Sequence, residues 1–456
     1  MRRSDWRLRL EGRLRFVLNR LGERLWVRPL LACGCSVAGV LLARVVDATP
    51  LAELLPEIGQ PTLRTLLQVM ASGMLVIATF AVASMVQAYA SASIAATPRA
   101  FPLVVADDVS QNALSIFVAA FIFSIVGLTA VENDFYGPAG RFTLFVLTMG
   151  VFAVVIGIFV RWTDRIARLG RLGHTIDKVE RATAQALARR RERPTLGAAP
   201  ARPGQTPLHP IYGPRTGHVQ LVDVRQLQQA AEAADTQVRV AAVPGDFVDP
   251  TRPLAWTDAA PDARAGDGPL AEALRASFVV GARRTLDHDP AFGLEVLAEI
   301  AGKALSPAVN DPGTAAEAVD SLTRLLVDWG RARPEPQEPD CPRVQLPPLR
   351  GEHLLQAAVP AFARHCAADV DCACRLQRAL ATVARNGDAA LAAAARDQAQ
   401  AACQRAAATL ALAADREAVA AAARAHGGDG DGSGEAEPEG GAGGARASSR
   451  KGSPQR

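Results

Sequence analysis

Four apolar stretches dominate the first third of the chain. They lie at residues 30–46, 65–89, 113–131 and 142–160. The hydrocarbon core of a bilayer is about 30 Å thick, so a helix needs roughly 20 apolar residues to cross it. Three stretches reach that length. The first is shorter and has Arg44 near its end, where an arginine can extend to the headgroups. The pattern predicts a four-span transmembrane domain over residues 30–160.

Basic residues beside the spans predict the orientation. Nine arginines lie in residues 1–29 and ten arginines or lysines in residues 161–193, whereas the loops 47–64 and 132–141 are mainly acidic. Excess Lys and Arg stay on the cytoplasmic side, so both termini are expected in the cytoplasm, as an even number of spans also requires. The chain has 47 arginines and 3 lysines, a bias typical of GC-rich bacterial genomes. The expected location is therefore the bacterial inner membrane.

The overall charge excludes one class of partner and favours another. A net charge of +4 is small for 456 residues, so nucleic-acid binding has no support. The basic residues instead gather beside the membrane, where the lipid bilayer and its anionic headgroups are the expected partners.

Two segments next to the spans are amphipathic. Residues 1–29 interleave aromatic and leucine residues with arginines, which is typical of a helix lying on anionic lipid; an ordinary cytoplasmic cap helix is the alternative. In the juxtamembrane helix at residues 161–193, apolar positions from Leu169 through Ile176 to Ala186 recur at steps of three and four. They predict either a parallel coiled coil, which would make a homo-oligomer, or a single helix packed on its own domain or on headgroups.

The rest of the chain is expected to be cytoplasmic. In order, we expect a linker at 194–216, a small β-rich module at 211–257, a helical region at 268–330 with helices over 270–287, 291–305 and 312–329, a proline-rich linker at 331–350, two alanine-rich helices within 351–426, and a disordered tail at 427–456. The expected fold class is mainly α: a four-helix transmembrane region followed by a cytoplasmic α+β domain, made of the β-rich module and a helical bundle, and a disordered C-terminal tail.

A sequence signature lies in the helical region. Residues 283–315 read RRTLDHDPAFGLEVLAEIAGKALSPAVNDPGTA. This segment resembles the signature of a bacterial membrane-protein family, domain of unknown function 2254. That family's approximate pattern is Arg-Thr-x-x-Gln-Asp-x-x-Phe-Gly, then a helix, then Ala-Leu-Ser-Pro-x-x-Asn-Asp-Pro-x-Thr-Ala. The matching residues include Arg284, Thr285, Phe292, Gly293, Ser306, Pro307, Pro312 and Thr314.

The resemblance covers roughly residues 30–330. Thr97-Pro98-Arg99 stands where the family has Ser-Pro-Arg before the third span, and Gly217, Gln220 and Gly245 fit the middle module. His288 replaces the family's usual glutamine. The resemblance implies membership of a family of predicted, uncharacterised membrane proteins, and it brings no activity or cofactor with it.

One cluster of polar residues is a candidate ligand or metal site. It consists of Asp287, His288, Asp289, Asn310 and Asp311. Carboxylates and an imidazole can bind a divalent cation or share a proton. The structural alternative is that the Asp-Pro pairs and Asn310 begin helices, and this alternative is favoured.

No other motif indicates a metal, a cofactor or catalysis. The spacing of Cys366, Cys372 and Cys374 does not fit a zinc knuckle. The β-rich module has no lysine that could carry a lipoyl group. Ser306 lacks the Gly-x-Ser-x-Gly elbow of hydrolases. We therefore expect no metal and no cofactor.

Three functions remain in order of preference. The first is a non-enzymatic membrane protein with a cytoplasmic sensing or scaffolding domain. The second is an oligomeric passive channel or transporter. Proton-coupled transport is disfavoured because the spans carry no mid-membrane Asp, Glu or His. The third is a membrane-embedded enzyme.

Overall fold

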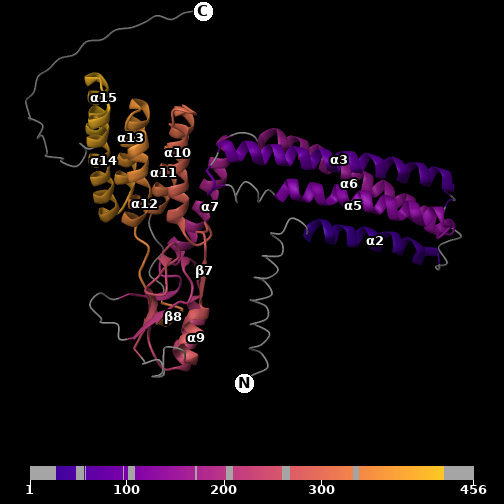
Figure 1. The fold of residues 1–456 in the computed structure, drawn as a ribbon, viewed down its shortest axis with the longest axis horizontal. Coiled ribbons are helices and arrows are strands. Elements are labelled where there is room, and N and C mark those ends of the chain that lie inside the picture. Colours follow the sequence, from indigo (N-terminus) through magenta and orange to yellow (C-terminus); the bar gives the residue numbers. More distant parts are fainter. Residues whose placement is uncertain are drawn as a thin grey trace, which may run out of the picture.

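The computed structural model describes residues 27–47, 56, 58–95, 97–100, 108–169, 172–201, 209–258, 268–331 and 338–425. Residues 1–26 of the amphipathic segment predicted at 1–29, and the tail predicted at 427–456, lie outside these ranges. In the described part, a long bundle of helices joins at one end to a second body, which contains further helices and two small sheets (Figure 1). The chain is mainly helical, as the sequence predicted.

The long bundle contains four helices that lie side by side. They are α2 (Val27–Asp47), α3 (Gln60–Ala95), α5 (Asp108–Glu132) and α6 (Pro138–Leu169). Three segments are long and apolar enough to cross a membrane, at Gln60–Ala88, Asn112–Glu132 and Pro138–Asp164. They confirm the second, third and fourth predicted spans. Helix α2 holds a shorter apolar segment, Cys33–Arg44, so it is not a span by length and composition alone.

Helices α3 and α6 are longer than a bilayer requires. At about 1.5 Å per residue, their 36 and 32 residues correspond to about 54 and 48 Å. The part beyond the apolar core reaches the second body, where α7 (Leu172–Glu192) follows α6.

The apolar seam of α7 is buried within the same chain. Ile176, Val179 and Thr183 are fully covered, and α7 packs on two helices of the second body, α10 (Pro290–Ala304) and α11 (Pro312–Gly330). A coiled coil with another copy would need this same face. Of the two alternatives left open by the sequence, the coiled coil is therefore wrong for α7, and packing on its own domain is observed.

The β-rich module is larger than the sequence predicted. The strands are β1 (Ala198–Pro200), β2 (His209–Tyr212), β3 (Gly217–Val222), β4 (Val238–Val240), β5 (Phe247–Val248), β6 (Pro253–Thr257), β7 (Phe278–Gly281) and β8 (Cys341–Leu346). One sheet has the order β1-β8-β4-β6-β2 and the other β5-β3-β7. The linkers predicted at 194–216 and 331–350 thus contain three strands. Strand β8 pairs in parallel with β1 and β4, which are distant in sequence, and β2 pairs antiparallel with β6.

A second correction concerns residues 270–287. Helix α9 covers only Pro269–Ala276, and Phe278–Gly281 forms β7 instead. Val279 and Val280 are β-branched and pair antiparallel with β3. Helix α8 (Val224–Ala233) covers the five-stranded sheet through contacts with β8.

The helical body packs around α10 and α11. Its other helices are α12 (Gly351–Cys366), α13 (Val370–Asn386), α14 (Ala389–Thr409) and α15 (Ala413–Arg424). Four helices therefore occupy the region where two alanine-rich helices were predicted. Asp369 and Asp388 cap α13 and α14 by accepting a hydrogen bond from the backbone N–H three residues on, and such caps begin new helices.

A junction at the first half of helix α10: candidate functional site

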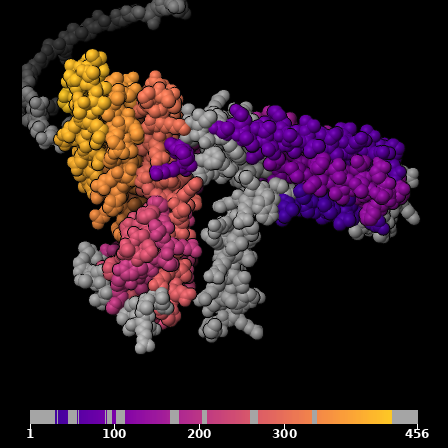
Figure 2. All heavy atoms as spheres, viewed as in Figure 1, coloured from indigo at the N-terminus to yellow at the C-terminus, as the bar shows by residue number. Residues whose placement is uncertain are grey.

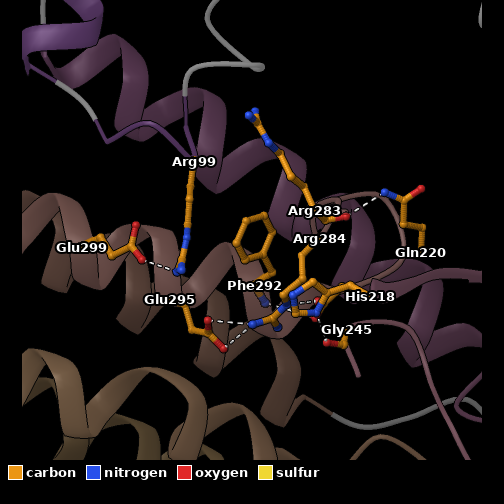
Figure 3. Close-up of polar contacts among 10 residues, drawn as sticks. Arg99, His218, Gln220, Gly245, Arg283, Arg284, Phe292, Glu295 and Glu299 are labelled. Atoms are coloured by element: carbon orange, nitrogen blue, oxygen red, sulfur yellow. Dashed lines mark hydrogen bonds and ion pairs between the residues drawn. The ribbon is translucent and has the colours of Figure 1, made fainter. Parts of the chain in front are cut away.

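Arg284, Asp289 and Glu295 form a partly buried charge network at the start of α10. Asp289 caps α10 by accepting a bond from the Phe292 N–H at 3.2 Å, and Pro290 occupies the first helical position. Arg284 Nε donates to Asp289 Oδ2 at 2.6 Å, and its Nη1 donates to both oxygens of Glu295 at 2.8 and 2.7 Å. The guanidinium also lies 4.9 Å from the centre of the Phe292 ring (Figure 3). One arginine thus fixes the turn before α10 to the helix itself.

The β-rich module contacts this network through a tight turn. Gly245 has a φ of +102°, and a Cβ there would lie 2.5 Å from Asp289 Oδ2. Only glycine fits without strain at such a position. The Gly245 carbonyl lies 3.2 Å from His218 Nδ1, and Gln220 Nε2 donates to the Arg283 carbonyl at 2.7 Å (Figure 3). The turn is therefore seated directly on the carboxylate that caps α10.

Helix α7 contacts the same part of α10 from another side. A Cβ on Gly293 would lie 1.9 Å from Thr183 Oγ1, so the two helices approach closely at this glycine. Arg189 Nη2 donates to the Asp287 carbonyl at 2.6 Å. These two contacts define the register that α7, which follows span α6 in the chain, has in this structure.

The loop between α3 and α5 brings the membrane region onto α10. Arg99 forms an ion pair with Glu299, and its guanidinium lies 6.0 Å from the centre of the Phe292 ring. Ala100 is fully buried and belongs to the core of the helical body. Figure 2 shows the short purple segment at residues 97–100 lying on the surface of α10. Burial raises the pKa of Glu299, while the charge of Arg99 opposes that shift.

The contacts made by Arg284, the β-rich module, α7 and the loop between α3 and α5 meet on the first half of α10 and the residues just before it. Asp289, Phe292, Glu295 and Glu299 follow each other along α10 at steps of three and four, which places them on one face. We call this set, with Arg284 and Arg99, the α10 junction. Its carboxylates hold arginines from two other parts of the chain, so the arrangement connects the loop between α3 and α5 to the helical body.

The predicted ligand cluster is not assembled in the structure. Asp287, His288 and Asp289 precede α10, whereas Asn310 and Asp311 follow it, and 15 helical residues lie between the two groups. Such a helix is about 22 Å long. Among the described residues, no group of three or more His, Cys, Asp or Glu side chains could hold a metal ion. The prediction that these five residues form one site is therefore wrong.

Each half of that cluster has a local structural role. Asp311 Oδ1 accepts from the Thr314 N–H at 3.1 Å and its Oδ2 from the Thr314 hydroxyl at 2.6 Å, so it caps α11. These hydrogen bonds lower the pKa of Asp311. Asn310 has a φ of +50° in the turn between the helices. His288 is half-buried, and burial lowers its pKa.

Comparison with known proteins agrees with this architecture. The sequence profile of a family described as predicted membrane protein, DUF2254, matches residues 22–382. The chain belongs to the DUF2254 family. An uncharacterised protein of Mycobacterium tuberculosis and one of Mycobacterium bovis are each 29% identical to it over 370 residues, which cover 78% of this chain and 68% of theirs. No solved structure matches the chain significantly.

The DUF2254 signature residues divide between the two ends of α10. Arg284, Phe292 and Gly293 belong to the junction end. Ser306, Pro307, Pro312 and Thr314 lie in the turn from α10 to α11, where the Ser306 hydroxyl donates to the Lys303 carbonyl at 2.6 Å. Thr285 lies in the segment before α10.

The sequence patterns do not identify two members of the α10 junction, Glu295 and Glu299. The available signal was the spacing of Glu295 and Glu299, two charges four residues apart on a helix that is otherwise largely apolar. The sequence identifies Arg99 only as part of the family pattern and does not indicate which carboxylate it pairs with.

Proposed function

We propose that this protein is a non-enzymatic, multi-pass membrane protein whose cytoplasmic domain senses the state of the membrane spans, or scaffolds partners in response to it. The observation that carries the proposal is the docking of residues 97–100 on α10. Ala100 is buried in the helical core and Arg99 is paired with Glu299. A loop that only connected two spans would not need to enter the core of another domain.

The loop is well placed to transmit movement. It follows α3, whose length carries it beyond the apolar core. The half-exposed Arg99–Glu299 pair contributes only about 0.2–1 kcal/mol by itself, so its value lies in fixing the position of the loop rather than in stability. The packing of Ala100 and the stacking near Phe292 keep the contact in one geometry.

We propose that α2 is a fourth span, with both termini in the cytoplasm of an inner membrane. Its 21 residues correspond to about 31 Å, which matches the bilayer core. The end of α2 is attached to the α5–α6 loop. The Tyr136 hydroxyl donates to the Val40 carbonyl at 2.8 Å, and the Arg44 guanidinium lies 4.1 Å from the centre of the Phe135 ring. This contact supports an antiparallel arrangement of four helices.

The passive channel has less support. Inside the helix bundle, the buried hydroxyls of Ser124 and Thr148 donate to carbonyls of their own helices, at 2.7 Å in each case. Large apolar side chains such as Leu67, Phe117 and Leu144 fill the space between the helices. A pore would therefore have to form between copies. Homo-oligomers and anionic headgroups remain proposed partners.

Hydrogen exchange in bilayers of two thicknesses tests the coupling. The full chain is reconstituted in nanodiscs of short-chain or long-chain lipid, as wild type and as Arg99→Ala. We expect lipid thickness to change the exchange rates of α10 amides in the wild type and to leave those of Arg99→Ala unchanged. An equal response in both proteins, or none in the wild type, would contradict the proposed coupling.

Labelling with a membrane-impermeant maleimide tests the topology. In a background without native cysteines, Asn133→Cys should be labelled in intact cells, whereas Arg331→Cys and an N-terminal tag should become accessible only after permeabilisation. If the N-terminal tag lies on the same side as residue 133, α2 does not cross the membrane.

A further inference from the structure

Arg190 is a buried cation whose side chain is not fully hydrogen-bonded within the described residues. The residue is only 5% exposed, and its Nη1 makes no hydrogen bond within the described part of the chain. Both neighbours are engaged, since Arg189 donates to the Asp287 carbonyl and Arg191 to the Asp328 carbonyl. A charge removed from water is normally paired, so the vacant donor of Arg190 requires an explanation.

The register of α7 places this arginine beside Asp289. Thr183 lies opposite Gly293. Six residues later in α7, Arg189 donates to the carbonyl of Asp287, which lies six residues before Gly293. The two segments therefore run antiparallel, and Arg190 follows directly after the arginine that binds Asp287, two residues before Asp289. Burial lowers the pKa of Arg190 to about 10, and the charge of Asp289 opposes this shift.

The nearby charges are unevenly shared. Arg284 holds two carboxylates, Asp289 and Glu295, whereas Arg190 forms no ion pair with the residues that the structure describes. Asp289 accepts one bond at each oxygen, from Arg284 and from the Phe292 N–H. Each carboxylate oxygen can accept two, so Asp289 has capacity for a second arginine.

We propose that Asp289 exchanges between Arg284 and Arg190, and that the structure represents the state in which Arg284 holds it. In the other state, Arg284 keeps both oxygens of Glu295 and Arg190 gains Asp289, so that each arginine has one carboxylate. We place the change in a sliding of α7 along α10, because Gly293 presents no side chain to α7 at their closest approach.

The exchange gives the proposed coupling a two-state element. Helix α7 follows span α6, so movement of α6 would change which arginine holds the cap of α10. Its use in signalling rests on the proposed function, but the exchange itself can be tested by stability alone.

A double-mutant cycle on the full chain in mild detergent tests the exchange. Methionine replaces each arginine because its volume is similar and it carries no charge. We expect Arg190→Met alone to leave the thermal midpoint unchanged or to raise it, and Arg284→Met to lower it. In the Arg284→Met background, Arg190→Met should lower the midpoint further, because Arg190 then holds Asp289. An effect of Arg190→Met that is the same in both backgrounds would overturn the proposal.

A distance measurement provides an independent test. Spin labels at the exposed positions Arg181 on α7 and Arg364 on α12 should report a shifted distance in Arg284→Met and the wild-type distance in the double variant. If Arg284→Met does not fold, Arg284→Lys takes its place, since lysine lacks the planar fork that holds two carboxylates. An unchanged distance together with an additive cycle would refute the exchange.

The two proposals fail in different ways. If lipid thickness has no effect on the exchange of α10 amides, but the effect of Arg190→Met on the thermal midpoint differs between the wild-type and Arg284→Met backgrounds, the coupling function is refuted and the exchange of Asp289 stands. If the lipid response is present but the cycle is additive, only the exchange is refuted.

Discussion

Replacement of Gly293 by alanine is a sharp test of how α7 packs on α10. The new Cβ would lie 1.9 Å from Thr183 Oγ1 and 2.9 Å from Thr183 Cβ and Cγ2, where ordinary contact begins at 3.4 Å. Thr183 cannot easily turn away, because it is fully buried, is β-branched, and donates its hydroxyl to the Val179 carbonyl at 2.7 Å. The helices themselves must therefore separate.

Two opposing contributions to the free energy of unfolding set the size of the change caused by Gly293→Ala. Alanine stabilises a helix interior by about 1 kcal/mol relative to glycine, whereas overpacking a close contact costs about 1–3 kcal/mol. With a contact this short we take the upper part of that range, which leaves a net loss of about 1–2 kcal/mol. For a domain of this size, each kcal/mol lowers the thermal midpoint by about 2–4 °C, so a decrease of about 2–8 °C is expected.

Gly302 on the same helix is the matched control. The three atoms nearest to a Cβ there belong to the ring of His365, with Nε2 at 2.6 Å, and this exposed side chain can swing aside. Gly302→Ala should therefore keep or raise stability, by up to about 1 kcal/mol. Both variants are compared as full chains by circular dichroism during heating. If Gly293→Ala is as stable as Gly302→Ala, the close packing of α7 on α10 is wrong.

Three further predictions address the caps, the pH response and the hidden strand. Asp311→Ala removes the α11 cap and should lower the free energy of unfolding by about 0.5–2 kcal/mol, while added divalent cation should not change the thermal midpoint of the wild type. If the cation does change that midpoint and Asp311→Ala abolishes the change, Asp311 is a ligand instead. Hydrogen bonds from Arg324 lower the pKa of Glu180 below its ordinary 4.5. The stability that this ion pair adds is therefore full above about pH 4.5 and is lost as the pH falls through the lowered pKa. Acid titration should destabilise the wild type more steeply than Glu180→Gln, and parallel curves would contradict this. Leu346 of β8 is fully buried, so Leu346→Ala should lower the free energy of unfolding by about 2–5 kcal/mol. The control Leu412→Ala, at an exposed position, should change it by less than about 0.5 kcal/mol. Equal urea midpoints of the two variants would contradict the placement of β8.

Much of the fold could be read from local sequence patterns. Apolar stretches of sufficient length identified three spans, and the Asp-Pro pairs at residues 289–290 and 311–312 located the starts of α10 and α11 to within one residue. These features depend on neighbouring residues only, so a single sequence reveals them.

The missed features depend on residues that are far apart in the chain. Strand β8 is interrupted by Pro342, and it is recognisable as a strand only through β1 and β4, more than 100 residues earlier. Arg99 and Glu299 are 200 residues apart, and no local pattern pairs them. The predicted Asp287–Asp311 cluster failed for the opposite reason, because closeness in sequence suggested closeness in space although a rigid helix separates the two halves.

The central claim is that the membrane loop is docked on α10 through Arg99 and Glu299, and a charge swap tests it most directly. Hydrogen exchange of α10 amides is measured in the full chain for Arg99→Glu, for Glu299→Arg and for the double variant. We predict faster exchange in each single variant, because like charges then oppose each other at the contact, and a return toward the wild-type rate in the double variant. If the double variant exchanges as fast as the sum of the single effects requires, the two residues do not interact and the docking of the loop on α10 is refuted.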